Sequence, residues 1–458
     1  MQDLTSGPIT RHLLKTTSFM LVTMIFQTLY FLVDLYWVGR LGTAAVAAVG
    51  IAGNLSFLVL ALTQMLGVGT TTVVSHAAGR KDHDAALLMF NQSQVLSMLV
   101  GLMVLIVGLA TRTGYANAQS ADAETARLAG QYLLWFIPAL ALQFTMVAMG
   151  SALRGVGNFK PGMVVSTATV AINIVLAPFL IFGWVTGHPF GVAGAAMASL
   201  FSILVGIVWL TKYFIAPDSF LRFMVADWKP RLDVWKKMLA IGLPAGFEFI
   251  LMAFYMFIVY TISRPFGAAA QAGFGIGMRI VQAGFMPVVA LGFSVAPVAG
   301  QNFGAKLAQR VKDTFKDAAF MAAGVMFVFA VLCHIAPAKL VGVFSNDPAA
   351  IAVGVDYLRI VSYNYVASGL IFVASSMFQA MGNTIPSLIA SAVRIGLVAV
   401  PAFMLARLPN FELTWIWYLS VAAVIVQLGI SMLLLRREFA RKLSFAPAGG
   451  FRPASTAA

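Results

Sequence analysis

Long apolar segments alternate along the chain with short connections rich in Gly, Pro and charged residues. An α-helix of about 20 mainly apolar residues spans the hydrocarbon core of a bilayer, with all its backbone polar groups paired internally. The pattern therefore predicts an all-α polytopic membrane protein. Its twelve transmembrane helices are expected at about 14–38, 46–76, 85–111, 127–152, 161–184, 191–214, 237–264, 270–298, 315–335, 353–379, 386–406 and 414–435.

The pattern occurs twice, at a constant offset of 225 residues. Gly42, Gly67, Gly79 and Gly157-Asn158 then align with Gly267, Gly292, Gly304 and Gly382-Asn383. A single offset that holds over more than a hundred residues indicates an internal duplication. Six helices per repeat give both repeats the same orientation, so we expect two six-helix lobes related by a parallel pseudo-two-fold axis.

The duplication divides the chain into four predicted parts. They are an N-terminal six-helix lobe in 1–214, a polar cytoplasmic linker in 215–236 that straps the lobes together, a C-terminal six-helix lobe in 237–435, and a basic flexible C-terminal tail in 436–458.

Composition and charge set the class and the orientation. With 60% hydrophobic and 10% charged residues and a mean hydropathy of +0.89, the chain is not a soluble globular protein. Twenty-one of the thirty Lys and Arg residues fall in the N-terminus, the even-numbered loops and the tail. The positive-inside rule then predicts cytoplasmic termini in a bacterial inner membrane. The net charge of +14 follows from this orientation, so we expect the lipid bilayer as a partner and no nucleic acid.

No arrangement of residues typical of catalysis occurs in the sequence. It contains no Walker A motif, no zinc-protease motif and no nucleophile elbow. The lone cysteine, Cys333, excludes disulfides and cysteine-based metal sites within the chain. We therefore expect a protein that is not an enzyme and has no cofactor other than a coupling proton or Na⁺.

Asp34 is one of two acidic residues deep within the predicted helices. A charge at the bilayer centre costs at least about 2.5 kcal/mol, so such a residue faces protein or water and marks a functional site. Thr23, Gln27, Tyr30 and Asp34 follow one another at spacings of 4, 3 and 4, which places them on one helix face. This polar stripe predicts the lining of an internal cavity, in which Asp34 binds a proton or an inorganic cation. The alternative is a structural acid that forms hydrogen bonds to neighbouring helices.

Glu248 is the second deep acid, and it begins a stripe with Met252 and Tyr255. It is either a substrate-cation or proton site, or a protonated partner in an interhelical hydrogen bond. At the offset of 225, Asp34 aligns with Val259 and Glu248 aligns with Thr23. Neither acid has an acidic counterpart, so we expect ion coupling and substrate binding to reside in different lobes.

Several motifs resemble the multidrug and toxic compound extrusion (MATE) family over nearly the whole chain. They include Val33-Asp34-Leu-Tyr-Trp-Val-Gly39-Arg40, Arg154-Gly155-Val-Gly157-Asn158, Asn173-Ile-Val-Leu-Ala177-Pro, Gly191-Val-Ala-Gly194 and Gly242-Leu-Pro244. The resemblance implies two lobes that form a V around a central cavity. It also implies export of small organic cations in exchange for protons or sodium.

The resemblance also implies roles for individual residues. Asp34 matches the cation-coupling acid of the N-terminal lobe, and Asn173 and Ser199 match supporting polar positions of the same site. Gln27, Tyr30, Glu248, Met252 and Tyr255 are expected to line the substrate cavity.

The chain departs from the family pattern at two of these places. The branch of DNA-damage-inducible exporters, which the chain resembles more, commonly has an acid where this chain has Ala177. Glu248 lies one turn closer to Pro244 than the helix-7 glutamate of the norfloxacin-exporter branch.

Three functions follow from these observations. The first is a secondary antiporter that exports cationic amphipathic compounds by alternating access and is functional as a monomer. The second is a flippase for lipid-linked precursors or anionic metabolites from the same superfamily, which the twelve helices and deep acids disfavour. The third is a polytopic membrane enzyme or a structural membrane protein, which the missing catalytic motifs and the intramembrane acids disfavour.

Overall fold

The computed structural model describes residues 2–185 and 187–445. Helices and the loops that join them make up this part of the chain. The elements are α1 (Ile9–Gly39), α2 (Thr43–Gly79), α3 (His83–Gln119), α4 (Ala123–Gly155), α5 (Phe159–Phe182), α6 (Val192–Ile215), η1 (Val225–Trp228), α7 (Leu232–Ser263), η2 (Arg264–Phe266), α8 (Ala268–Gly304), α9 (Ala308–Ile335), α10 (Pro337–Gly342), α11 (Pro348–Val361), η3 (Ser362–Asn364), α12 (Tyr365–Ala380), α13 (Ile385–Leu405) and α14 (Thr414–Lys442).

Twelve helical spans in the described residues are long and apolar enough to cross a membrane, as the sequence predicts. The tenth predicted helix is two helices, α11 and α12, joined by the short 3₁₀ turn η3. Helix α14 continues to Lys442, so the first residues of the predicted tail, 436–442, are helical. The rest of that tail, from residue 446, lies outside the described residues.

The backbone repeats at the offset found in the sequence. Helix α8 begins and ends 225 residues after α2, and the span Pro348–Ala380 corresponds in the same way to α4. Lys81 and Lys306, which are equivalent, are the two non-glycine residues with positive φ in the described chain, at 58° and 59°. The duplication is therefore a property of the local geometry as well as of the residue pattern.

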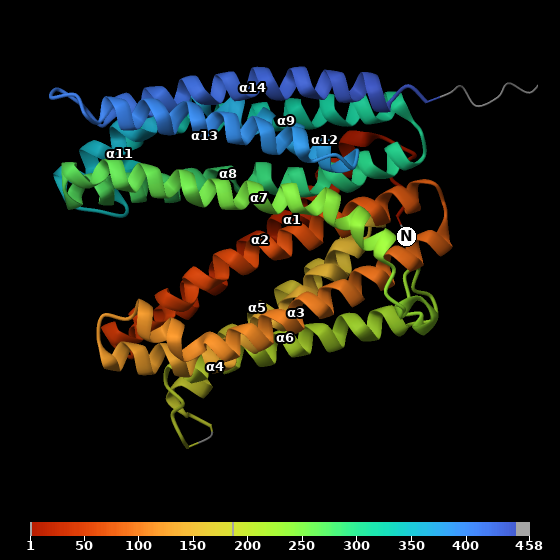
Figure 1. The fold of residues 1–458 in the computed structure, drawn as a ribbon, viewed down its shortest axis with the longest axis horizontal. Helices are drawn as coiled ribbons and strands as arrows, with labels where there is room; N and C mark the ends of the chain where they lie inside the picture. Colours follow the sequence, from red (N-terminus) through yellow and green to blue (C-terminus); the bar gives the residue numbers. More distant parts are fainter. Residues whose placement is uncertain (1, 186, 446–458) are drawn as a thin grey trace, which may run out of the picture.

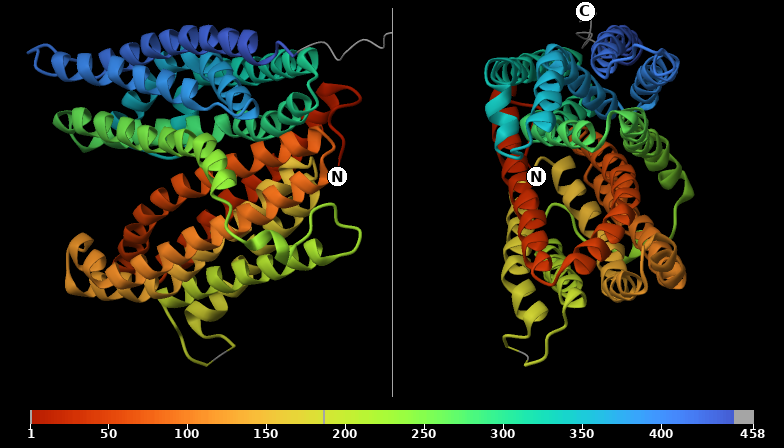
Figure 2. Two further views of the ribbon diagram at one scale, coloured as in Figure 1. Left: turned by 45° about the vertical axis from the view of Figure 1, so that its right-hand side comes forward. Right: turned by 90° about the vertical axis from the view of Figure 1, so that its left-hand side faces the viewer.

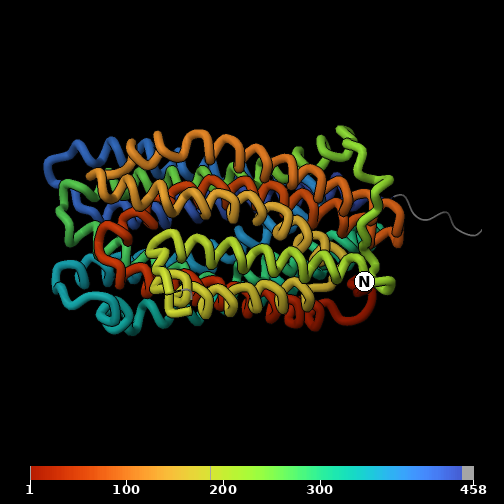
Figure 3. Tube along the Cα trace, turned by 90° about the horizontal axis from the view of Figure 1, so that it is seen from below, coloured from red at the N-terminus to blue at the C-terminus, as the bar shows by residue number. Residues whose placement is uncertain are grey.

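The two repeats form two lobes that meet at one end and diverge toward the other. Figure 1 shows the N-lobe (α1–α6) below the C-lobe (α7–α14), and Figure 2 shows the same separation from two further directions. Seen from below in Figure 3, the long helices run roughly along one common direction. The lobes meet at the right-hand end of Figure 1, near the N-terminus, and we call this the closed end.

Helix packing at the closed end leaves no room for side chains at several glycines. All residues of 65–79 in α2 and of 294–302 in α8 are buried. A Cβ at Gly79 would lie 2.0 Å from the backbone oxygen of Gln301, and a Cβ at Gly304 would lie 2.3 Å from that of His76. Small residues let helix backbones approach closely in a membrane protein. Glycine at these positions is therefore a condition for closing this end.

The N-terminal segment, defined as residues 2–7, crosses to the C-lobe at the closed end. Leu4 is fully buried there. Its backbone N–H donates to Oε1 of Gln301 at 3.0 Å, and its carbonyl accepts from Nδ2 of Asn302 at 3.2 Å. Arg310 donates to the carbonyl of Gly7 at 3.0 Å. The first segment of repeat one is thus held by helices of repeat two.

The linker makes the reciprocal arrangement, because it binds to α3 of the N-lobe. Oδ1 of Asn91 accepts from the backbone N–H of Met224 at 3.0 Å, and the side-chain amide of Gln92 donates to the carbonyl of Lys229 at 2.7 Å. Oε1 of Gln92 also accepts from the backbone N–H of Arg231 at 2.9 Å. The segment that leads into each repeat therefore packs on a helix of the other repeat.

Candidate functional site

Three helices of the N-lobe bring three predicted site residues into one hydrogen-bonded group. The hydroxyl of Tyr30 (α1) lies 2.8 Å from Oγ of Ser199 (α6). Nδ2 of Asn173 (α5) donates to the same Oγ at 3.2 Å, and the Ser199 hydroxyl donates to the carbonyl of Ala195 at 3.3 Å. Ser199 is therefore the centre of the group. Ser199 ends a run of small residues that allow close helix packing. The structure shows that its hydroxyl also connects a polar network.

Asp34 lies one helical turn after Tyr30 and is 8% exposed. Its Oδ1 is enclosed and has no hydrogen-bond partner among the described residues. A buried carboxylate oxygen without a donor is costly unless it takes up a proton or a cation. Asp34 is thus the one buried acid among the described residues of the N-lobe, and its carboxylate can bind a proton or a cation.

The polar stripe of α1 is not buried along its whole length. Thr23 is buried, and its hydroxyl donates to the carbonyl of Phe19 at 3.0 Å within the helix. Gln27 is exposed. The face predicted to be uniformly internal therefore has an accessible amide between two enclosed positions.

Glu248 of α7 forms the corresponding polar group of the C-lobe. Its Oε1 accepts from the hydroxyls of Ser387 and Ser391 of α13, the latter at 3.2 Å. Its Oε2 accepts from the hydroxyl of Ser375 of α12 at 3.3 Å. Ser387 also lies 2.8 Å from Ser375. Unlike Asp34, this carboxyl group is surrounded by hydroxyls that hold it in place.

A chain of contacts extends from this group toward α14 and back to α7. Nε2 of Gln427 donates to Oγ of Ser391 at 3.3 Å, and Arg394 donates to Oε1 of Gln427 at 3.5 Å. The Arg394 guanidinium lies 5.1 Å from the ring centre of Tyr255, whose hydroxyl lies 3.1 Å from Oγ of Ser420. A partly buried positive charge, Arg394, therefore belongs to the same polar system as Glu248.

The predicted stripe of Glu248, Met252 and Tyr255 separates into different surroundings. Tyr255 is buried within the C-lobe, whereas Met252 is 48% exposed. Met252 is therefore accessible to a ligand or to lipid, whereas Tyr255 contacts Arg394 and Ser420 inside the C-lobe.

Sequence reasoning did not identify Ser375, Ser387, Ser391, Gln427 or Arg394 as members of a site. A signal was present for three of them, because Ser387, Ser391 and Arg394 are spaced by 4 and 3 and so share one face of α13. Ser375 and Gln427 lie on other helices, and their part in the group depends on tertiary packing.

The two acids belong to separate lobes, Asp34 to the N-lobe and Glu248 to the C-lobe. Within residues 2–185 and 187–445, no three His, Cys, Asp or Glu side chains gather as a metal-binding group would require. The arrangement can therefore hold protons or organic cations at two separate carboxyl groups, of which Glu248 accepts from serine hydroxyls and Asp34 has an oxygen without a donor among the described residues.

Comparison with known proteins agrees with this architecture. The family model MatE matches residues 20–179 and 244–404. Multidrug export protein MepA of Staphylococcus aureus (strain MRSA252) is 25% identical over 434 residues, covering 93% of this chain and 94% of the relative. MepA of Staphylococcus haemolyticus (strain JCSC1435) is 27% identical over 411 residues, covering 89% of each chain.

Two solved structures share the fold over almost the whole chain. One is a multidrug resistance MATE family transporter of the MOP superfamily in an outward-facing conformation. It has a TM-score of 0.88 at 24% identity and covers 97% of this chain and 98% of that one. The other is a MOP superfamily transporter from Pyrococcus furiosus Vc1 (DSM3638), described as having a binding pocket of reversed polarity. Its TM-score, identity and coverage are the same.

Proposed function

The chain belongs to the MatE family, and we propose that it is a secondary antiporter that exports cationic amphipathic compounds in exchange for a cation by alternating access. Relatives named as multidrug export proteins, a duplicated two-lobe fold and one acid within a membrane-spanning helix of each lobe, Asp34 and Glu248, support this function. The observation that carries the proposal is the enclosed Oδ1 of Asp34, which has no donor among the described residues.

Asp34 is the coupling residue in this proposal, and Asn173 and Ser199 support it. When the site faces the side of higher cation activity, the carboxylate takes up the coupling cation and its negative charge is neutralised. The network of Tyr30, Ser199 and Asn173 holds α1, α5 and α6 together around the acid. A change of charge at Asp34 therefore alters the electrostatics of a group shared by three helices.

The hydrogen bonds of Ser199 favour a proton over sodium as the coupling cation. A hydroxyl donates one hydrogen bond and accepts two. Ser199 donates to Ala195 and has Tyr30 and Asn173 as its other two partners, so it has no lone pair left for a metal ion. An inorganic cation needs several oxygen ligands, and Ala177 adds none from α5. A proton requires only Asp34.

The substrate is an organic cation that binds between the lobes. Gln27 and Met252 are exposed on α1 and α7, and Tyr30 and Glu248 lie on the same faces. A carboxyl group attracts a positive charge, while methionine and aromatic side chains adapt to varied flat molecules by dispersion and cation–π contact. Tyr255, which is buried, contributes by orienting Arg394 beneath this surface.

The orientation follows from the distribution of basic residues. Lys81 and Lys306 follow the ends of α2 and α8, which meet at the closed end. The N-terminal segment and the linker lie at the same end, so this is the basic side of the chain. Applied to the structure, the positive-inside rule makes the closed end cytoplasmic in a bacterial inner membrane, with both termini on that side. The structure is then the outward-facing state, and the protein works as a monomer.

Gradient-driven uptake of a fluorescent organic cation into inverted membrane vesicles tests the function. Wild type is compared with Asp34→Asn, and with Asp84→Asn as a control for an exposed acid outside the site. A proton gradient and a sodium gradient are imposed separately. We expect uptake driven by the proton gradient in wild type and in Asp84→Asn, and none in Asp34→Asn at equal protein level.

Two results would contradict the proposal. Normal uptake by Asp34→Asn would remove the coupling role of this acid. Absence of gradient-driven uptake for every organic cation tried, with folded protein in the membrane, would favour transport of a lipid-linked precursor or an anionic metabolite.

A further inference from the structure

Among the hydrogen bonds that join the lobes at the closed end, two run from a side chain of one lobe to the carbonyl at the C-terminal end of a helix of the other lobe. Nε2 of His76 in α2 lies 2.6 Å from the carbonyl oxygen of Ala380 at the end of α12. A carbonyl oxygen only accepts, so Nε2 carries the hydrogen. Nε2 of Gln301 in α8 donates to the carbonyl of Gly155 at the end of α4 at 2.9 Å. Both bonds are buried. A third bond, from the Thr72 hydroxyl to the carbonyl of Gln379 at 3.0 Å, lies beside the first.

The two bonds are equivalent under the internal duplication. At the offset of 225, His76 corresponds to Gln301 and Gly155 corresponds to Ala380. The donors differ in residue type, so the sequence alone hides their equivalence. One bond runs from the N-lobe to the C-lobe and the other runs back, so separating the lobes at this end requires both to break.

The loops that supply the acceptor carbonyls are held by a second equivalent pair. Nδ2 of Asn158 donates to the hydroxyl of Tyr213 at 2.7 Å in the N-lobe. In the C-lobe, Nδ2 of Asn383 donates to Oε1 of Glu438 at 3.0 Å. Asn383 and Glu438 are the equivalents of Asn158 and Tyr213 at the same offset.

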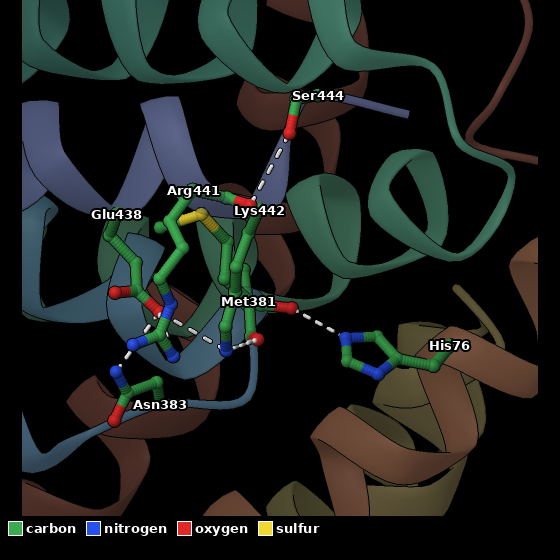
Figure 4. A network of polar contacts seen from close by, with 8 residues as sticks. His76, Met381, Asn383, Glu438, Arg441, Lys442 and Ser444 are labelled. Carbon is green, nitrogen blue, oxygen red and sulfur yellow. Dashed lines mark hydrogen bonds and ion pairs between the residues drawn. The ribbon is translucent and has the colours of Figure 1, made fainter. Parts of the chain in front are cut away.

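Lys442 strengthens the C-lobe anchor. Its Nζ lies 3.2 Å from Oε1 of Glu438 and donates to the carbonyl of Met381 at 2.8 Å. Figure 4 shows this anchor on one side of the loop after α12 and the His76 ring directed at the loop from the other side. The C-lobe itself therefore holds the acceptor carbonyl of Ala380 in position, without a contribution from His76.

We propose that His76 and Gln301 form a paired latch that holds the closed end shut and must open in each transport cycle. They are positioning residues, since they act on the relation of the lobes. The inference rests on the proposed transport function only in the statement that the lobes separate at this end during the cycle. The latch itself is a property of the closed state.

The two halves of the latch differ in what braces them. Oε1 of Gln301 also accepts from the backbone N–H of Leu4, so this amide ties the N-terminal segment to the latch. His76 has an aromatic neighbour instead, with its ring centre 5.0 Å from that of Phe303. Loss of Gln301 therefore removes one hydrogen bond to the end of α4 and one to the N-terminal segment. Loss of His76 removes only the hydrogen bond to the end of α12, where the bond from Thr72 to Gln379 remains.

Spin labels at Asp84 and Gln309 measure whether the latch holds. These positions are exposed and equivalent, in the first turns of α3 and α9, and they lie on opposite lobes. The labels are attached to introduced cysteines in a Cys333→Ala background, and electron paramagnetic resonance gives the distance distribution in detergent and in nanodiscs. Thermal unfolding of each variant checks that it is folded.

The variants are His76→Leu, Gln301→Leu, their combination, and His76→Gln as the matched control. His76→Gln places at position 76 the amide that performs the same task at position 301. For His76→Leu we expect a roughly tenfold rise in the ratio of the long-distance to the short-distance population. This is about the change in an equilibrium that the loss of one buried hydrogen bond produces. The rise should be larger for Gln301→Leu, about a hundredfold for the double variant, and small for His76→Gln.

Unchanged distances in the folded double variant would overturn the latch. So would a His76→Gln variant that opens as much as His76→Leu, because the hydrogen bond would then not be the cause. The distances are measured without substrate or gradient. A latch that behaves as expected in a protein without cation export would therefore refute the proposed function and leave the latch standing.

Discussion

Replacing Gly79 by alanine should open the closed end, because α2 and α8 touch there without a side chain between them. A Cβ at Gly79 would lie 2.0 Å from the backbone oxygen of Gln301 and 2.8 Å from its carbonyl carbon. Gly53 in the same helix has nothing within 4 Å of such a Cβ. Gly53→Ala is thus a control with the same chemical change at a position where the added methyl group meets no other atom.

The size of the effect follows from the overlap. An oxygen at 2.0 Å falls 1.4 Å short of the 3.4 Å at which ordinary van der Waals contact begins. Both atoms belong to buried helix backbone near the ends of α2 and α8, so the helices have to separate by about that amount. The hydrogen bond from Gln301 to Gly155, at 2.9 Å, would then be stretched beyond its range.

The free-energy cost combines two contributions. Overpacking typically costs about 1–3 kcal/mol. A buried polar group left without its partner costs about 1–3 kcal/mol more. A total of roughly 3 kcal/mol shifts the equilibrium between closed and open lobes by about two orders of magnitude.

Distances between spin labels at Asp84 and Gln309 measure this shift. We expect a large population at long distance in Gly79→Ala and a wild-type distribution in Gly53→Ala. The equivalent variant Gly304→Ala should behave like Gly79→Ala, because its Cβ would lie 2.3 Å from the backbone oxygen of His76. If Gly79→Ala and Gly53→Ala give the same distribution and both proteins are folded, the closed end does not depend on close approach of the two helices.

Three further predictions concern the linker between the lobes, the loop anchors Asn158 and Asn383, and the N-cap of α4. Gln92→Leu removes the side chain that binds the carbonyl of Lys229 and the N–H of Arg231, so limited proteolysis within 222–231 should accelerate at least about tenfold; Gln119→Leu, at the exposed end of the same helix, should leave it unchanged. Asn383→Ala should lower the melting temperature more than Asn158→Ala. The first variant removes a hydrogen bond to the buried carboxylate of Glu438, which contributes about 1.5–3 kcal/mol to stability, and the second removes one to the neutral hydroxyl of Tyr213, which contributes about 0.5–1.5 kcal/mol. Equal melting temperatures would contradict this. Asp122 caps α4, and donation from the backbone N–H of Thr125 to its carboxylate lowers the pKa of Asp122 below its ordinary 3.8. The stabilisation by the cap is therefore fully present above pH 3.8 and is lost as the pH falls through the lowered pKa of Asp122. Hydrogen exchange of the backbone amides in the first turn of α4 should accelerate over this pH range, and Asp122→Asn should abolish this transition.

The sequence predicts the helices and the duplication well because both are patterns along one dimension. Span length follows from bilayer thickness, and the constant offset reappears in the equal φ values of Lys81 and Lys306. The group around Asp34 could be anticipated in part, because Tyr30 shares the polar stripe of Asp34 and the resemblance to the MATE family implied that Asn173 and Ser199 support this acid. The structure brings these three together.

Other parts of the sites depend on packing that the sequence does not encode locally. Serine is common in membrane helices for close packing, so nothing in the sequence distinguishes Ser375 as a partner of Glu248. Periodicity gives the face of a helix but not what lies opposite it, which is why Gln27 and Met252 are exposed beside buried neighbours. His76 and Gln301 align at the offset of 225, yet their different chemistry concealed a shared contact.

The exchange of leading segments between the repeats has a consequence for biosynthesis. Asn91 and Gln92 in α3 are completely buried, and their backbone partners are made 131–139 residues later. The separation is larger for Leu4, because its partner Gln301 follows it by 297 residues. Leu4 is therefore synthesised long before its partner, and it is among the last residues of this chain to reach its place. Assembly of the closed end becomes a late step, reached only after α8 has been inserted and both halves of the chain are present in the same membrane.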